Sequence, residues 1–172
     1  MYLKVSGSTK LDRQKESLRR VRAIANYQFE ADIGSALFPE DTAITFSKRT
    51  GRPRHLCLGE TVIATLKPTD GLLALTLAGA RRLAEARPAP RLRVMVREDV
   101  MKFIAEGGDV FARHVVSADS ALRVGEEAIV ASSGGEVVAV GKALLTGKEM
   151  LSFKRGVAVK VRKGVGETRC GE

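Results

Sequence analysis

A run of cations near the C-terminus is the part of this sequence best suited to binding chemistry. Residues 154–164 contain five Lys or Arg and no Asp or Glu. Three valines alternate through the run, which is typical of a strand with one apolar face, and Lys160 and Arg162 would then project from the other face. We interpret the run as a buried strand that offers positive charge to an anionic partner. A solvated, lysine-rich strand face is the alternative.

Residues that could perform catalysis or bind a metal are few and scattered. His55 and His114 stand alone without metal-ligand spacing, and Cys57 and Cys170 form no Cys-x-x-Cys pair. Residues 132–135, Ser-Ser-Gly-Gly, are not followed by the Lys and Ser or Thr of a phosphate-binding loop and indicate a hairpin turn instead. We therefore predict no catalytic residue, no metal and no cofactor.

The charge balance also favours an anionic partner. The 172 residues carry 29 Lys or Arg against 20 Asp or Glu, a formal net charge of +9. Residues 1–88 hold 15 basic and 9 acidic side chains, and residues 89–172 hold 14 and 11, so both halves are basic. Such a balance is typical of proteins that bind nucleic acid by displacing counterions from its phosphates. The alternative is that the net positive charge only keeps the protein soluble.

Composition places the chain among globular proteins of one medium or two small domains. Hydrophobic residues make up 44% and charged residues 28% of the sequence. No stretch approaches the roughly 20 apolar residues that span a bilayer. The N-terminal residues lack the apolar segment of a secretory signal. We therefore expect a cytoplasmic protein with no membrane partner.

The first half predicts a small α+β domain. A charged helix over residues 9–29 precedes a short helix over residues 33–37, and a third helix follows Thr76. Strands are expected over residues 43–47, 54–58, 61–66 and 72–75. The hairpin between the first two strands turns at Gly51 and presents four cations as a second candidate contact with a polyanion, Lys48, Arg49, Arg52 and Arg54.

A proline-rich break separates the two halves. Arg87-Pro88-Ala89-Pro90 has two prolines within three residues, which favours a domain boundary. We therefore expect one domain over residues 1–88 and another over residues 89–164. Residues 165–172 form a polar tail.

The second half predicts a small mixed or antiparallel sheet closed into a barrel. A helix from about Asp99 ends at Gly107-Gly108, and a short helix is expected over residues 148–153. Strands are expected over residues 91–96, 110–116, 127–131, 136–144 and 157–161. The core would come from Val94, Val96, Phe103, Ile104, Val138, Val140, Val157, Val159 and Val161.

Nearly all of residues 91–164 resembles the PUA domain, an RNA-binding pseudo-barrel of pseudouridine synthases and archaeosine transglycosylases. The matching stretches are residues 106–113, 118–127, 138–143 and 155–163. Residues 27–29, 36–40, 48–52 and 66–71 are similar to the domain that precedes PUA in archaeal tRNA-guanine transglycosylase, and archaeosine synthase has a similar tail. The resemblance implies an α+β fold, with a small α+β N-terminal domain followed by a PUA-type β pseudo-barrel. The catalytic barrel of a full transglycosylase, roughly 250 residues, is not part of the match.

The resemblance also implies a binding surface along the glycine-ended helix, the strand after it and the closing strand. The residues implied to contact RNA are Gly107, Gly108, Val110, Phe111, Arg113, Lys154, Arg155, Lys160, Arg162 and Lys163. Glycines admit a sugar–phosphate backbone, cations bind phosphates and an exposed aromatic ring stacks on an unpaired base. A core position is the alternative for Phe111, because it lies in an alternating strand.

We therefore expect a non-catalytic RNA-binding protein that is directed at structured RNA, above all tRNA, and is linked to tRNA modification. Two alternatives remain open. In one, the chain is the separately encoded RNA-binding subunit of an archaeosine transglycosylase or synthase and joins a catalytic chain. In the other, it is an adaptor in translation or ribosome assembly.

Overall fold

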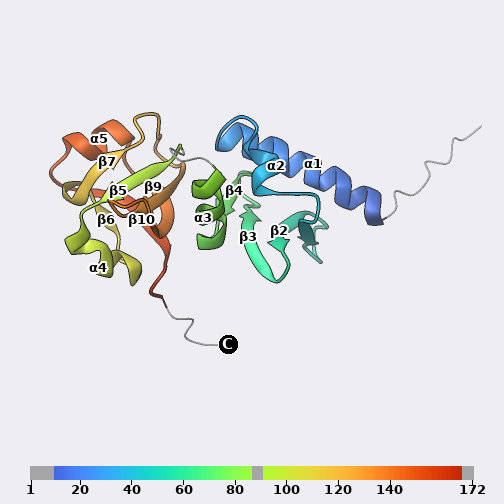
Figure 1. The fold of residues 1–172 in the computed structure, drawn as a ribbon. Helices are drawn as coiled ribbons and strands as arrows, with labels where there is room; N and C mark the ends of the chain where they lie inside the picture. The colour runs from blue at the N-terminus through green and yellow to red at the C-terminus, as the bar shows by residue number, and fades with distance from the viewer. Residues whose placement is uncertain (1–9, 87–90, 168–172) are drawn as a thin grey trace, which may run out of the picture. The chain divides into compact units, whose positions relative to one another are not determined.

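A long amphipathic helix, α1 (Lys10–Gln28), begins the described part of the chain. Its apolar residues Leu18, Val21 and Ala25 recur at helical spacing and are buried, as the sequence predicts. The computed structural model, which describes residues 10–86 and 91–167, shows α1 packed against the short α2 (Ile33–Leu37) and running along a sheet (Figure 1). No helix in this described part has the length and apolar character that crossing a bilayer requires.

The sheet beside α1 confirms the strands expected in the first half. Its order is β1-β2-β3-β4. The bounds are β1 (Ala43–Phe46), β2 (Pro53–Leu58), β3 (Thr61–Leu66) and β4 (Leu73–Leu75). Gly51 and Gly59 have φ values of 65° and 57° at the two tight turns, a conformation that suits glycine. The buried Gln28 side chain joins α1 to β4, because its amide donates to the Leu73 carbonyl and accepts from the Leu73 N–H, both at 2.8 Å.

The chain divides into two compact units, and the boundary between them lies after Leu73. The second unit opens with the end of β4 and with α3 (Leu77–Ala86), which packs on β9 (Val137–Ala143). Thr76 caps α3, because its hydroxyl accepts from the Gly79 N–H at 3.2 Å. The proline-rich break at residues 87–90 and Cys170 lie outside the described residues, so the boundary expected at residues 88 and 89 stays a prediction.

Six strands of the described residues form the sheet of the second unit, in the order β6-β10-β9-β8-β5-β7. The bounds of the other five are β5 (Arg93–Val96), β6 (Val110–Phe111), β7 (Val115–Ala118), β8 (Glu127–Ala131) and β10 (Val157–Gly164). The edge strands β6 and β7 are joined by a 3-10 turn of three residues, Ala112–His114, so the two edges of the sheet meet. The sheet therefore curls into a nearly closed barrel, which confirms the expected pseudo-barrel.

The prediction of a single strand over residues 110–116 is wrong. The chain leaves β6 after Phe111 and enters β7 at the opposite edge of the sheet. Burial alternates straight through the turn, since Val110 and Ala112 are buried and Phe111 and Arg113 are exposed. An alternating pattern of this kind predicts one continuous strand. Closure of the barrel instead requires the chain to pass here from one edge strand of the sheet to the other.

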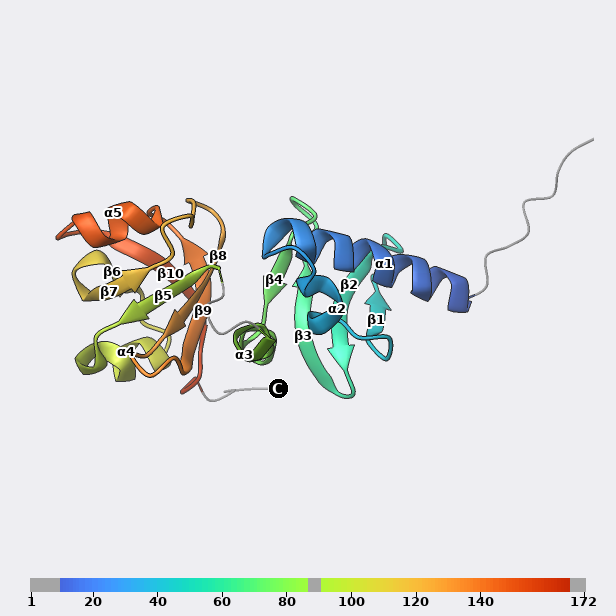
Figure 2. The ribbon, with the colours of Figure 1, turned by 45° about the horizontal axis from the view of Figure 1, so that its top comes forward.

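Two short helices lie at opposite ends of the barrel in both views (Figures 1 and 2). One is α4 (Met101–Ala105), which follows a 3-10 turn at Glu98–Val100. The other is α5 (Gly147–Ser152), whose start is fixed by a capping box. The Glu149 carboxylate accepts from the Thr146 N–H at 2.8 Å, and the Thr146 hydroxyl accepts from the Glu149 N–H at 3.3 Å.

The core of the second unit differs from the expected set at three positions. Phe103 is 56% exposed, because it lies on the outer face of the one-turn helix α4 whereas Ile104 points inward. Val157 and Val161 are only half-buried. The strict alternation of β10 fails because Ala158 and Val159 are both buried and the register against β9 shifts between Val161 and Lys163. The other six expected core residues are buried.

Candidate nucleic-acid interface

The glycine pair after α4 ends the helix and is covered by side chains of this chain. The N–H groups of Gly107 and Gly108 donate to the carbonyls of Ile104 and Phe103 at 3.0 and 2.9 Å, and Gly107 has a φ of 96°. A Cβ on Gly107 would meet the Glu167 carboxylate, and one on Gly108 would meet the Phe103 ring. Close approach of a sugar–phosphate backbone to these glycines therefore requires Phe103 or Glu167 to move.

A pocket of about 300 Å³ opens beside this loop. Its lining residues are Asp99, Val100, Phe103, Ile104, Asp109, Phe111, Arg113 and His114. Phe111 is 37% exposed, so its ring is available at the surface instead of filling the core. The Arg113 guanidinium lies over that ring at 5.9 Å from its centre, and its Nε donates to His114 Nε2 at 3.0 Å.

His114 is held in its neutral form by this arrangement. Burial and the neighbouring Arg113 charge lower the pKa of His114 below its ordinary value of 6.5. Because Nε2 accepts from Arg113, the ring proton belongs on Nδ1. That atom is buried and has no hydrogen-bond partner among the described residues. His114 therefore supports the positions of Phe111 and Arg113 and adds no positive charge near neutral pH.

Two lysines of β10 face carboxylates at the surface. Lys160 Nζ lies 2.8 Å from Asp109 Oδ2. The other oxygen of this carboxylate, Oδ1, accepts from the Val161 N–H at 3.0 Å. Asp109 therefore ties the glycine loop to β10. Lys163 Nζ lies 2.7 Å from Glu167 Oε2, and this hydrogen bond lowers the pKa of the Glu167 carboxyl. A phosphate reaching either lysine competes with a carboxylate that is already there.

Arg162 is 40% exposed, but its guanidinium is already bound within this chain. Its guanidinium donates to both oxygens of Glu127, at 2.7 and 3.0 Å, and to the Leu75 carbonyl at 2.7 Å. Glu127 is only 4% exposed and also accepts from the Leu75 N–H at 3.2 Å. Much of the Arg162 charge is thus used to hold Leu75, the last residue of β4, to the barrel.

The cations that remain available lie in the turn before β10. Lys154 and Arg155 are exposed and form no ion pair with any described residue. The turn is placed beside the pocket by β6, because Val157 pairs with Phe111 and the Ala112 N–H donates to the Gly156 carbonyl at 3.0 Å. The turn that carries Lys154 and Arg155 therefore lies beside the backbone of Phe111 and Ala112. Val110 is fully buried in β6, so its side chain belongs to the core.

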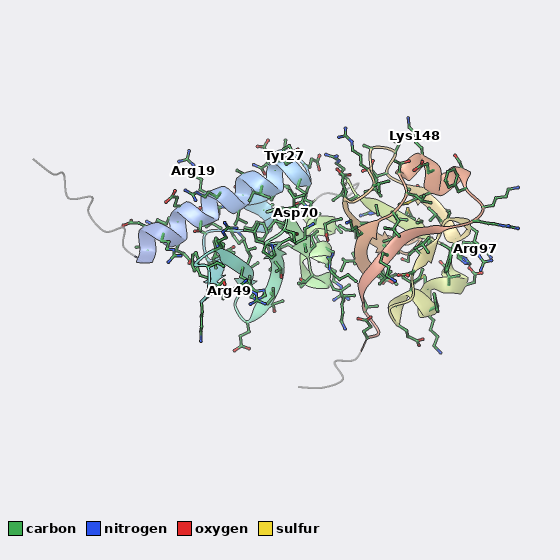
Figure 3. The ribbon with its side chains drawn as sticks, turned by 180° about the vertical axis from the view of Figure 1, so that it is seen from behind. Arg19, Tyr27, Arg49, Asp70, Arg97 and Lys148 are labelled. Carbon is green, nitrogen blue, oxygen red and sulfur yellow. The ribbon has the colours of Figure 1, made fainter. Side chains whose placement is uncertain are left out.

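The hairpin of the first unit forms a separate basic surface. The hairpin carries the four expected cations, Lys48, Arg49, Arg52 and Arg54. All four are exposed and make no ion pair within the described residues, and Figure 3 labels Arg49. Arg13 of α1 holds the hairpin, because its guanidinium lies 4.4 Å from the centre of the Phe46 ring and donates to the Gly51 carbonyl. Arg19 and Tyr27, also labelled in Figure 3, lie exposed on α1.

Sequence reasoning missed four residues that shape the interface. They are Phe103, Asp109, His114 and Glu167. For Asp109 the signal was its place directly after two glycines, but its partners on β10 are 51 and 52 residues away. In the described ranges no three His, Cys, Asp or Glu side chains gather closely enough to hold a metal ion.

Comparison with known proteins identifies both halves. The family model described as "Patch-forming domain C2 of tRNA-guanine transglycosylase" matches residues 19–90, and the model of the PUA domain matches residues 92–165. The chain contains a PUA domain over residues 92–165. Its resemblance to the C-terminal region of archaeal tRNA-guanine transglycosylase is thereby confirmed.

The PUA-domain protein is similar to curated archaeal enzymes over most of its length. It is 40% identical over 149 residues to a tRNA-guanine(15) transglycosylase of Methanothermobacter thermautotrophicus, and 42% identical over 150 residues to one of Thermococcus kodakarensis. Each match covers 87% of this chain but only 23% and 26% of the enzymes. The chain thus spans about a quarter of the length of these relatives.

Solved structures share the fold of this PUA-domain protein. A hypothetical protein from Pyrococcus horikoshii superimposes with a TM-score of 0.74 at 22% identity, covering 90% of this chain and 93% of the other. A conserved PUA domain protein from Thermoplasma acidophilum gives a TM-score of 0.64 at 25% identity, with coverages of 90% and 91%. The α+β fold with a PUA-type barrel is confirmed.

Proposed function

We propose that this protein binds tRNA through its PUA domain and serves tRNA modification as a non-catalytic, RNA-binding part. The observation that carries the proposal is the match of both domains, in order, to archaeal tRNA-guanine(15) transglycosylases at about 40% identity. The linkage to archaeosine and a cytoplasmic location belong to the same proposal.

The available cations support binding by shape and backbone. Lys154, Arg155 and Arg113 would bind phosphates, and Lys160 and Lys163 would exchange their carboxylates for phosphates. The hairpin cations Lys48, Arg49, Arg52 and Arg54 would provide a second, independent contact. Recognition would rest on RNA geometry and 2′-hydroxyl groups, with few contacts to bases.

Binding of a tRNA transcript, compared with a DNA duplex of similar length, tests this proposal. We expect tRNA to bind more tightly at every salt concentration, because a site that reads A-form shape and 2′-hydroxyls discriminates against DNA. Equal affinity for both would reduce the protein to a generic polycation.

A second candidate is favoured by the coverage of the relatives, of which this chain matches about a quarter. Here the chain acts with a catalytic transglycosylase portion as its partner. Guanine exchange into tRNA by an archaeal catalytic portion, assayed with and without this chain, tests the idea. Stimulation that depends on Lys154 and Arg155 is expected, whereas unchanged exchange would leave RNA binding alone or an adaptor role.

A further inference from the structure

A second, larger cavity lies where α3 packs on the barrel, and we call it the α3 cavity. Its volume is about 670 Å³, within the range of small-molecule sites. Residues of α3, of β5, of α4 and of the start of β9 line it. It shares no lining residue with the pocket beside the glycine loop, so the two sites are distinct.

The floor of the α3 cavity is apolar. Val137 and Val138, at the start of β9, are 9% and 4% exposed and line it. Ala84 of α3 and Ala105 and Met101 of α4 are half-buried around them. Small side chains leave the space between α3 and α4 open above the valines. A flat organic ring lying there would be removed from water by these groups.

Three cations from three different elements also line the cavity. They are Arg81 of α3, Arg93 of β5 and Lys102 of α4. Arg81 and Lys102 are exposed and form no ion pair within residues 10–86 and 91–167. One terminal nitrogen of Arg93, Nη1, lies 4.0 Å from the position that a Cβ on Gly135 would take, so this guanidinium reaches the hairpin turn at the rim. Converging cations favour an anionic group between them.

Two carboxylates at the same cavity exclude a ligand that is only an anion. Glu85 lies in the last turn of α3, Glu136 lies directly before β9, and both side chains are exposed. Although Glu85 and Arg81 are four residues apart on α3, no ion pair joins them. Carboxylates repel phosphate but accept hydrogen bonds from hydroxyl and amino groups. The ligand therefore combines an anionic end with hydrogen-bond donors and a ring.

We propose that the α3 cavity is a binding site for a nucleoside monophosphate. The phosphate lies between Arg81 and Lys102, the base covers the valine floor, and the ribose hydroxyls or a base amine face Glu85 or Glu136. A nucleotide is the common ligand class that carries all three groups at this size. The site goes beyond RNA binding and does not depend on it.

Titration of AMP into the full chain labelled with ¹⁵N tests the site. We expect the amide resonances of Gly135 and Glu136 to shift, with a Kd below about 1 mM. Adenosine lacks the phosphate and inorganic phosphate lacks the ring, so each should bind at least about tenfold more weakly than AMP. Equal binding of adenosine and AMP, or no shift at millimolar AMP, would overturn the proposal.

Matched substitutions locate the phosphate. Arg81→Gln and Lys102→Gln should each weaken AMP binding about tenfold, because each removes a charged partner of the phosphate. Both side chains are exposed and unpaired, so the melting temperature should not change. Lys148→Gln is the control, since Lys148, labelled in Figure 3, is an exposed cation of α5 that does not line the cavity. Equal weakening in all three variants would overturn the site.

Binding of tRNA by the same variants shows whether the phosphate comes from a free nucleotide or from RNA. We expect Arg81→Gln and Lys102→Gln to bind tRNA within about twofold of the unmodified protein, and saturating AMP to leave tRNA bound. Loss of tRNA and AMP affinity together would assign the phosphate to RNA and overturn a separate nucleotide site. Binding of AMP without any binding of tRNA would overturn the proposed function and support this site.

Discussion

Lys160, Arg162 and Lys163 follow one another closely on β10, yet their ion pairs have different energetic roles. The side chains of Lys160 and Lys163 are 65% and 42% exposed, and exposed pairs contribute less than about 1 kcal/mol. Glu127, the partner of Arg162, is 4% exposed, so its charge would be left buried if Arg162 were removed. The lysines are therefore free to change partners, whereas Arg162 stabilises the fold by pairing with a buried carboxylate.

Replacing Arg162 should destabilise the protein. We expect Arg162→Gln to lower the free energy of unfolding by about 2–3 kcal/mol, less than for a fully buried pair because Arg162 is itself 40% exposed. Lys160→Gln, with the same loss of charge, should cost less than about 1 kcal/mol. Urea denaturation followed by circular dichroism measures both. Equal losses in the two variants would contradict the structural role of Arg162.

His114 should make stability depend on pH. Burial and Arg113 hold its folded-state pKa below the ordinary 6.5, so the unfolded chain takes up the proton first as pH falls. The stabilising contribution is complete above pH 6.5 and is lost between that value and the lowered pKa. We expect the fall in melting temperature from pH 7.5 to pH 5.5 to be smaller in His114→Gln than in the unmodified protein. An identical fall in both would exclude His114 as the cause.

At the scale of elements, the sequence predicts those helices, turns and strands that depend on residues close together in the chain. The helix at α1, the turns at Gly51 and Gly107 and most strand positions follow from spacing over a few residues. The division of residues 110–116 into β6 and β7 cannot be predicted from local spacing, because barrel closure is a property of the whole sheet. The partners of Arg162 and Asp109 lie 35 to 87 residues away, so no local pattern indicates them.

The segment before the proline-rich break should stabilise the barrel. Leu75 is bound by Glu127 and Arg162, and α3 buries Ala80 and Leu83. A fragment of residues 74–172 should therefore unfold cooperatively at a clearly higher temperature than a fragment of residues 89–172, which lacks α3 and leaves the Glu127–Arg162 pair without its backbone partner. Thermal unfolding followed by circular dichroism compares them. Equal midpoints would support a barrel that is complete from residue 89.

At the scale of the whole molecule, net charge and local placement of charge make different predictions. The chain has a formal charge of +9, and a generic polycation would lose affinity for RNA equally wherever a cation is removed. Cations that contact phosphates also determine how steeply affinity falls with salt, at about 0.7–0.9 counterion released per contact. With about seven contacts over the two basic surfaces, log K should fall against log salt with a slope near 5 to 6.

The salt dependence of tRNA binding by matched double variants tests the PUA surface most directly. Lys154→Gln with Arg155→Gln removes two unpaired cations beside the pocket, and Lys15→Gln with Arg19→Gln removes two exposed cations from α1. We expect the first pair to weaken tRNA binding at least several-fold and to reduce the slope by about 1.5, because two phosphate contacts are lost. The α1 pair should leave the slope nearly unchanged. Equal reductions in both would contradict binding through the PUA domain.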